Sequence, residues 1–137
     1  MTTCVPLDAP FTDDRGLIQN VLHRNIGSVV VITSVAGSTR ASHWHKKDWH
    51  YCFVMSGRID YFEREVGSIA TPRHQVIKEG ELFFTPPCME HEMYLPVDTV
   101  FLTLANLHRT PADYEADLIR LAKTLRGEFM LATGTVP

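Results

Sequence analysis

The chain has 137 residues, 45% of them hydrophobic, and a formal net charge of -3 at pH 7. This length suits one folded domain, so we expect residues 1–137 to form a single domain. The acidic balance argues against a nucleic-acid partner, and no apolar run approaches the ~20 residues that cross a membrane. The first residues lack the pattern of a secretory signal, which predicts a cytoplasmic protein.

Short strands dominate the pattern from residue 28 onward. Residues 28–35 form a β-branched run between Gly27 and Gly37. Residues 49–55 and 58–66 flank Ser56-Gly57, which predicts a β-hairpin. Further strands are expected at 75–78, 81–85, 92–95 and 99–105. Many short strands separated by turn signals are typical of an all-β barrel or sandwich.

The C-terminal part predicts an α-helix at about 111–126. Thr110 is a good N-cap, and Pro111 suits the first helical position. Five residues fall on one stripe at helical spacing: Tyr114, Leu118, Leu121, Ala122 and Leu125. We expect this stripe to pack on the outside of the barrel. A contact with a second copy of the chain is the alternative.

Four histidines stand in two segments framed by glycine and proline: His43, His45, His50 and His91. Residues two apart on a strand share a face, so His43 and His45 are expected to project together. Imidazole is the commonest side-chain ligand of transition metals, and four converging rings nearly complete a first shell. The alternative is that all four are ordinary polar or half-buried residues. Their joint spacing favours the metal site.

These residues resemble the paired motifs of the cupin superfamily, G-x5-H-x-H-x3,4-E-x6-G and G-x5-P-x-G-x2-H-x3-N. The first motif matches from Gly37 to Gly57, with His50 in place of the glutamate. The second keeps Gly80, Pro86 and His91, with Cys88 for the glycine and Leu95 for the asparagine. The resemblance covers about residues 27–104.

The resemblance implies a cupin double-stranded β-helix, or jelly-roll barrel, with its core at about 27–105 and the helix appended. It also implies one divalent transition metal ion (Fe, Mn, Ni, Cu or Zn) and a homodimer. Replacing the glutamate with His50 leaves the ion its full formal charge, which should make it a stronger Lewis acid. The sequence identifies no catalytic residue.

Residues 11–18 resemble the D-x-R-G strand of cupin-fold sugar-nucleotide epimerases and ketoisomerases. The Arg15 guanidinium could bind a phosphate in two-pronged fashion, although a plain solvated turn is the alternative. Tyr51 and Tyr61 are further candidates for substrate binding. Those epimerases work without a metal, so the resemblance does not transfer their mechanism whole.

Three functions fit these features. The first is a metal-dependent isomerase or epimerase of a small polar substrate, such as a keto-sugar or sugar nucleotide. The second is an Fe(II)-dependent dioxygenase, since cupins with all-histidine iron sites include such enzymes. The third is a non-catalytic cupin that binds a metal or ligand. We favour the first, with no role for nucleic acid or membrane.

Overall fold

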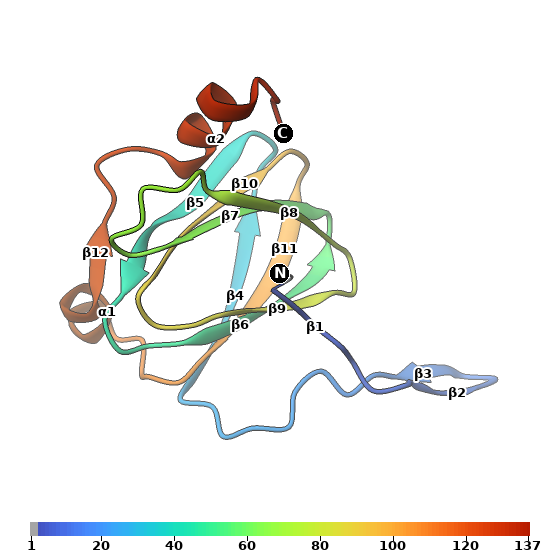
Figure 1. Cartoon of the computed structure of the whole chain (residues 1–137). Coiled ribbons are helices and arrows are strands. Elements are labelled where there is room, and N and C mark those ends of the chain that lie inside the picture. Colours follow the sequence, from blue (N-terminus) through green and yellow to red (C-terminus); the bar gives the residue numbers. More distant parts are fainter. Residues whose placement is uncertain (1–2) are drawn as a thin grey trace.

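The computed structural model describes residues 3–137, and most of its regular secondary structure is β-strand (Figure 1). The elements in chain order are β1 (Cys4–Val5), β2 (Phe11–Asp13), β3 (Gly16–Ile18), β4 (Ser28–Ser34), β5 (Ser38–His45), β6 (His50–Ser56), β7 (Arg58–Glu65), β8 (Arg73–Lys78), β9 (Leu82–Thr85), β10 (Met89–Leu95), β11 (Thr99–Ala105), α1 (Pro111–Asp117), β12 (Leu118–Arg120) and α2 (Leu125–Thr133). Among these described elements, no helix is long and apolar enough to cross a lipid bilayer.

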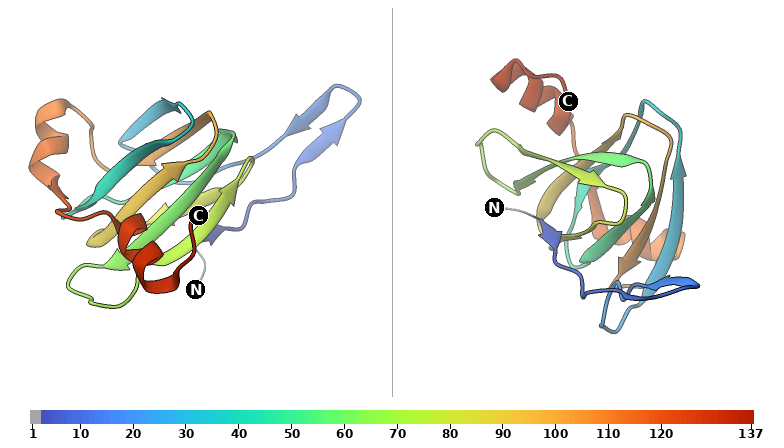
Figure 2. Two further views of the ribbon diagram at one scale, coloured as in Figure 1. Left: turned by 90° about the horizontal axis from the view of Figure 1, so that it is seen from above. Right: turned by 90° about the vertical axis from the view of Figure 1, so that its right-hand side faces the viewer.

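Two five-stranded antiparallel sheets form the barrel (Figures 1 and 2). One has the order β1-β9-β6-β11-β4, and the other has the order β12-β5-β10-β7-β8. Their inward side chains alternate with outward ones along each strand, as the two-residue period requires. The core between them consists of Cys52, Val54, Ile59, Tyr61, Ile77, Phe83, Met93, Leu95 and Phe101. The predicted jelly-roll barrel is confirmed.

The hairpin predicted around Ser56-Gly57 is wrong. β6 pairs with β9 and β11, whereas β7 pairs with β8 and β10, so the chain changes sheets at Gly57. Gly57 has a φ of 90°, and a Cβ there would lie 2.5 Å from the carbonyl oxygen of Asp98. Both strands carry apolar side chains that must be buried, and placing the strands in opposite sheets buries both sets in one core.

The C-terminal helix predicted at 111–126 begins as expected, with Thr110 as its N-cap and Pro111 in its first turn, but its predicted extent is wrong. α1 ends at Asp117, and Leu118 has extended backbone angles. Residues 118–120 then pair with the edge of β5, with Leu118 opposite His45 and Arg120 opposite His43. This pairing satisfies edge backbone groups of β5 and buries Leu118, which outweighs the helical preference of the segment. A second helix, α2, follows and packs against β7 and β10.

The corner at Gly57 should tolerate no side chain. Gly57→Ala combines the strain of a positive φ with a clash against Asp98. Gly67 has a similar φ of 87° but open space around it, so Gly67→Ala introduces the strain without the clash. We expect Gly57→Ala to lower the free energy of unfolding by about 2 kcal/mol more than Gly67→Ala does. Urea unfolding of both variants measures the difference. Equal losses would contradict the close approach to Asp98.

Candidate metal centre

A bulge in β5 aims its histidines into the barrel. Pairing with β10 runs from His91 opposite His43 to Glu92 opposite Ala41, which leaves Ser42 as an extra residue. Ala41 and Ser42 have φ values of 68° and 60°, and the Ser42 hydroxyl donates to the buried Glu92 carboxylate. Bulges bend a strand and redirect its side chains. Beyond this bend His43 and His45 both point inward and are buried, as predicted for residues two apart.

All four predicted histidines meet inside the barrel. His43 and His45 come from β5, His50 begins β6, and His91 lies on β10. The His43 ring centroid is 4.8 Å from those of both His45 and His91. The His50 ring centroid is 5.1 Å from that of His91 and 5.7 Å from that of His45. All four side chains are buried, so the rings form one enclosed cluster.

Hydrogen bonds fix which ring nitrogens face the interior. His91 Nδ1 donates to the backbone carbonyl of Met89 at 2.9 Å, because a carbonyl oxygen can only accept. His45 Nδ1 donates to the Asp117 carboxylate at 3.2 Å. In neutral rings this leaves Nε2 of both residues with a free lone pair. Among residues 3–137, the buried ring nitrogens without a partner are His43 Nδ1 and His91 Nε2.

The environment keeps these rings neutral. Burial lowers the pKa of His43 to about 2, with a further lowering from neighbouring His91 and His45. Burial likewise lowers the pKa of His91 to about 4 and that of His50 well below its usual value. The pKa of His45 is lowered by burial but held up in part by Asp48 and Asp117. Metal ligation requires neutral imidazole, so the cluster is in the right protonation state.

Three of the four rings could hold a metal ion. His43, His45 and His91 each offer one nitrogen, and these atoms all lie within 4.8 Å of one another. The unpartnered nitrogens of His43 and His91 fit this role, since a buried polar atom without a partner is costly unless a ligand satisfies it. His50 lies beside the group but outside it, and stays a predicted fourth ligand.

The histidines line a cavity of about 250 Å³. Its lining includes three arginines, one tyrosine and, among the described residues, a single acidic side chain: Arg40, Arg109, Arg120, Tyr114 and Asp48. The Arg109 guanidinium lies 4.3 Å from the centre of the Tyr114 ring. The surplus of positive charge makes the cavity suited to an anionic ligand.

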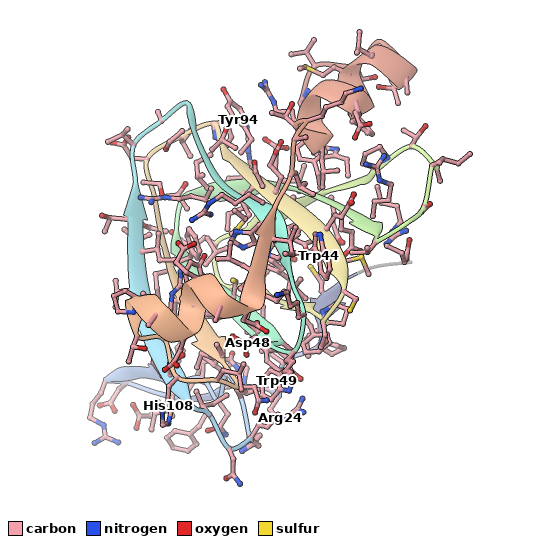
Figure 3. All side chains as sticks on the ribbon, turned by 90° about the vertical axis from the view of Figure 1, so that its left-hand side faces the viewer. Arg24, Trp44, Asp48, Trp49, Tyr94 and His108 are labelled. Carbon is pink, nitrogen blue, oxygen red and sulfur yellow. The ribbon has the colours of Figure 1, made fainter. Side chains whose placement is uncertain are left out.

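The C-terminal segment closes one side of this cavity. Figure 3 shows α1 and β12 crossing this side of the barrel, with Asp48 beside them. The Asp117 carboxylate accepts from His45 and from the backbone N–H groups of Lys47 and Asp48, at 2.9 and 3.1 Å. The Tyr114 ring centroid is 6.0 Å from that of His43 and 5.7 Å from that of His45. Burial raises the pKa of Tyr114, so its hydroxyl stays protonated.

The three residues predicted to bind substrate lie elsewhere. Arg15 is on the β2–β3 hairpin, exposed and paired with Asp13. Tyr51 faces away from the core and accepts a hydrogen bond from Arg24. Tyr61 lies in the core with its hydroxyl 2.7 Å from that of Thr85. All three are outside the cavity lining, and their role in substrate binding stays a prediction.

Sequence reasoning missed Tyr114, Asp117, Arg109 and Arg120. Tyr114 was expected to belong to the apolar stripe of a helix, and Asp117 was hidden inside that same predicted helix. Only the break after Asp117 and the pairing of β12 with β5 bring these side chains to the histidines. An acidic residue in a helical pattern carries no local signal for such a contact.

The neutral buried rings predict a pH dependence of stability. The unfolded chain binds a proton at His91 near pH 6.5, whereas the folded chain does so only near pH 4. Stability from neutral His91 is therefore complete above pH 6.5 and is lost as the pH falls towards 4. Within this window it contributes a slope of up to about 1.4 kcal/mol per pH unit.

Replacing His91 with glutamine removes this titration. We therefore expect the metal-free His91→Gln variant to lose less stability than the unaltered chain between about pH 6.5 and about pH 4, by up to about 1.4 kcal/mol per pH unit. Urea unfolding across this range measures it, with the exposed His23→Gln as the control. A slope equal to that of the unaltered chain would contradict a depressed pKa for His91.

Comparisons with known proteins reveal the fold. No protein-family model matches the chain. No curated protein matches it either. A variant of the sugar 3,4-ketoisomerase QdtA from Thermoanaerobacterium thermosaccharolyticum, solved with TDP-4-keto-6-deoxyglucose, matches with a TM-score of 0.70 at 18% identity. That match covers 98% of this chain and 96% of the other.

Two further solved structures are similar. The dTDP-6-deoxy-D-glucose-3,5-epimerase RmlC from Legionella pneumophila has a TM-score of 0.70 at 13% identity, over 88% of this chain and 72% of its own. The capsular polysaccharide assembling protein CapF from Staphylococcus aureus has a TM-score of 0.63 at 24% identity, over 85% of this chain. The chain spans about a third (34%) of the length of CapF. The chain therefore has the cupin fold that sugar-nucleotide isomerases and epimerases also adopt.

Proposed function

We propose that this protein is a metal-dependent isomerase or epimerase of an anionic keto-sugar carried on a nucleotide. One observation carries the proposal: three histidine nitrogens within 4.8 Å of one another open onto a cavity lined by three arginines. The fold shared with a ketoisomerase and an epimerase supports the same reaction class.

The cavity favours a small anionic group. Arginine binds phosphate and carboxylate through paired N–H donors, and three arginines against one acidic residue leave a net positive lining. A volume of about 250 Å³ is below the usual range for whole drug-sized ligands, about 300–1,000 Å³. The reacting sugar and the phosphate attached to it would therefore occupy the cavity, while the nucleoside would extend outside it.

The residues around the cavity would have separate roles in this reaction. A divalent ion held by His43, His45 and His91 would supply Lewis acidity towards a carbonyl oxygen. Asp117 holds the His45 ring in one tautomer and orientation, as carboxylates behind metal-binding histidines generally do. Tyr114, protonated and half-buried beside His43 and His45, would donate a hydrogen bond to the substrate oxygen as negative charge develops on it.

A second candidate is the same reaction without a metal. The buried hydrogen bond between His45 and Asp117 would orient the ring as a general base, with Tyr114 as the acid. The Fe(II)-dependent dioxygenase and the non-catalytic binding cupin stay alternatives from the sequence. Bound metal, oxygen uptake and turnover separate all four.

The metal is tested first, on protein purified without a histidine tag. We expect about one Fe, Mn, Ni, Cu or Zn ion per chain by mass spectrometry, and its loss in His91→Ala. Asp117→Asn should weaken metal affinity about 10- to 100-fold, because it removes the carboxylate behind His45. His23→Ala, an exposed histidine, is the control and should keep the metal. Absence of metal after reconstitution would favour the metal-free candidate.

The substrate is tested with TDP-4-keto-6-deoxyglucose in D₂O, where NMR follows deuterium uptake beside the carbonyl. Loss of the charge in Arg109→Met should raise KM about 10- to 100-fold, from about 1.5–3 kcal/mol of charge-assisted binding. Tyr114→Phe should lower kcat about 10²- to 10⁴-fold with little change in KM.

Arg58→Met, at an exposed arginine outside the cavity, is the control for that experiment and should behave like the unaltered protein. Oxygen consumption in an electrode, without deuterium uptake, would favour the dioxygenase instead. Tight binding of the nucleotide sugar with neither reaction would favour a binding protein.

A further inference from the structure

The bulge in β5 decides which side chains reach the cavity. Arg40 and His43 both line the cavity, although they lie three positions apart on the strand. In a regular strand, residues an odd number of positions apart face opposite sides of the sheet. The extra residue Ser42 removes this conflict, so Arg40 and the two histidines of β5 share one cavity. Without the bulge, either the arginine or the histidines would face away from the cavity.

The bulge has a backbone conformation that other contacts must hold. Ala41 and Ser42 have φ values of 68° and 60°, in the left-handed region, which residues with a side chain rarely adopt. Such a conformation persists only where the surrounding structure enforces it. The contacts that hold the bulge therefore also set the positions of the histidines that follow it.

Ser42 is held at two points. Its hydroxyl donates to the Glu92 carboxylate, and its carbonyl oxygen accepts from the backbone N–H of Leu121 at 2.9 Å. The other carboxylate oxygen of Glu92 accepts from the backbone N–H of Arg126 at 3.0 Å, in the first turn of α2. Glu92 is only 1% exposed, so water does not compete for either bond. This one side chain therefore connects the bulge to α2.

A carboxylate suits the position of Glu92. Its two acceptor oxygens bond the Ser42 hydroxyl and the Arg126 N–H at the same time. The first turn of a helix has N–H groups without helical partners and a partial positive charge, and both stabilise a buried carboxylate. The helix is itself fixed to the barrel, because Arg64 of β7 pairs with Glu128 of α2 at 2.9 Å. The bulge is thus connected to a helix that is already docked.

We propose that Glu92 is a positioning residue, which holds the bulge of β5 against α2 and thereby aims His43 and His45 at His91. Glu92 directly follows His91 on β10, so it fixes the place of the β5 histidines relative to the β10 histidine. The docked position of α2 then becomes part of the metal centre. The inference rests on the proposed function, because it concerns the geometry of the same metal site.

The first test uses the metal-free protein. Glu92→Met keeps an unbranched side chain of similar length and removes both hydrogen bonds. We expect the Leu121 amide, which donates to Ser42, to exchange its hydrogen at least about 10-fold faster in this variant. NMR measures the exchange, and the Gly80 amide, which donates to Val54 away from the bulge, is the internal reference. Equal Leu121 exchange in the variant and the unaltered chain would overturn the proposal.

The second test is a titration with Co²⁺, followed by visible absorption. Glu92→Met should weaken Co²⁺ binding about 10- to 100-fold. Glu92→Gln should stay within about 3-fold of the unaltered chain, because its amide oxygen can accept from Arg126 and its NH₂ group can donate to the Ser42 oxygen. Glu90→Gln is the matched control and should bind like the unaltered chain, because Glu90 lies on the same strand but bonds Arg64.

A rescue separates positioning from a general loss of stability. Glycine adopts a φ of about 60° without strain, so the bulge would depend less on Glu92 if Ser42 were glycine. Adding Ser42→Gly to Glu92→Met should restore Co²⁺ affinity to within about 3-fold of the unaltered chain. A double variant that binds no better than Glu92→Met would overturn the proposal. Circular dichroism checks folding, and Ser42→Ala, which removes only the hydroxyl, replaces Glu92→Met in both tests if that variant does not fold.

The two proposals fail in different ways. If the unaltered chain binds no Co²⁺, the metal-dependent function fails, and the exchange of the Leu121 amide still tests the hold of Glu92 on the bulge. If the unaltered chain and Glu92→Met bind Co²⁺ equally well, the metal centre stands and the positioning role of Glu92 is overturned.

Discussion

The centre of this protein depends on the burial of four imidazole rings in a barrel interior. A buried ring must find partners for both of its nitrogens or bear the cost of desolvation. His91 and His45 each give one nitrogen to the protein, through Met89 and Asp117, and direct the other inward. Among the described residues, His43 Nδ1 and His91 Nε2 are left without a partner, which makes the cluster a candidate for metal binding.

The C-terminal segment owes its course to the edge of β5, the strand that carries two of these histidines. A continuous helix from 111 to 126 would leave the edge of β5 unpaired beside the histidines. The chain instead leaves the helix at Asp117, pairs Leu118 and Arg120 with β5, and then forms α2. The short helix α1 thereby supplies both Tyr114 and the Asp117 carboxylate behind His45, and the strand that follows it covers the edge of β5. The segment thus forms part of the cavity wall.

The outer faces of the two sheets differ in what covers them. The outer side of β7 and β10 is covered by α2, and the outer side of β4, β6 and β11 remains apolar and open. The β2–β3 hairpin stands away from the barrel, and its Arg15, a predicted substrate contact, is outside the cavity lining.

The sequence by itself determined the features that depend on residues close together in the chain. The alternation of side chains along a strand placed His43 and His45 on one face, and strand and turn signals predicted an all-β barrel. Tertiary structure alone decided which strands pair. The local pattern around Gly57 fits a hairpin and a corner between sheets equally well, and only burial of both strands in one core distinguishes them.

The same reason explains the site residues that sequence reasoning missed. Asp117 and Tyr114 lie about seventy positions from the histidines of β5 in the sequence. The pattern of residues within their own segment gives no indication of such distant partners. Helical propensity is weak enough for an unpaired sheet edge to override it. The four clustered histidines were therefore predictable from their spacing, whereas the side chains around them were settled by the packing of the whole chain.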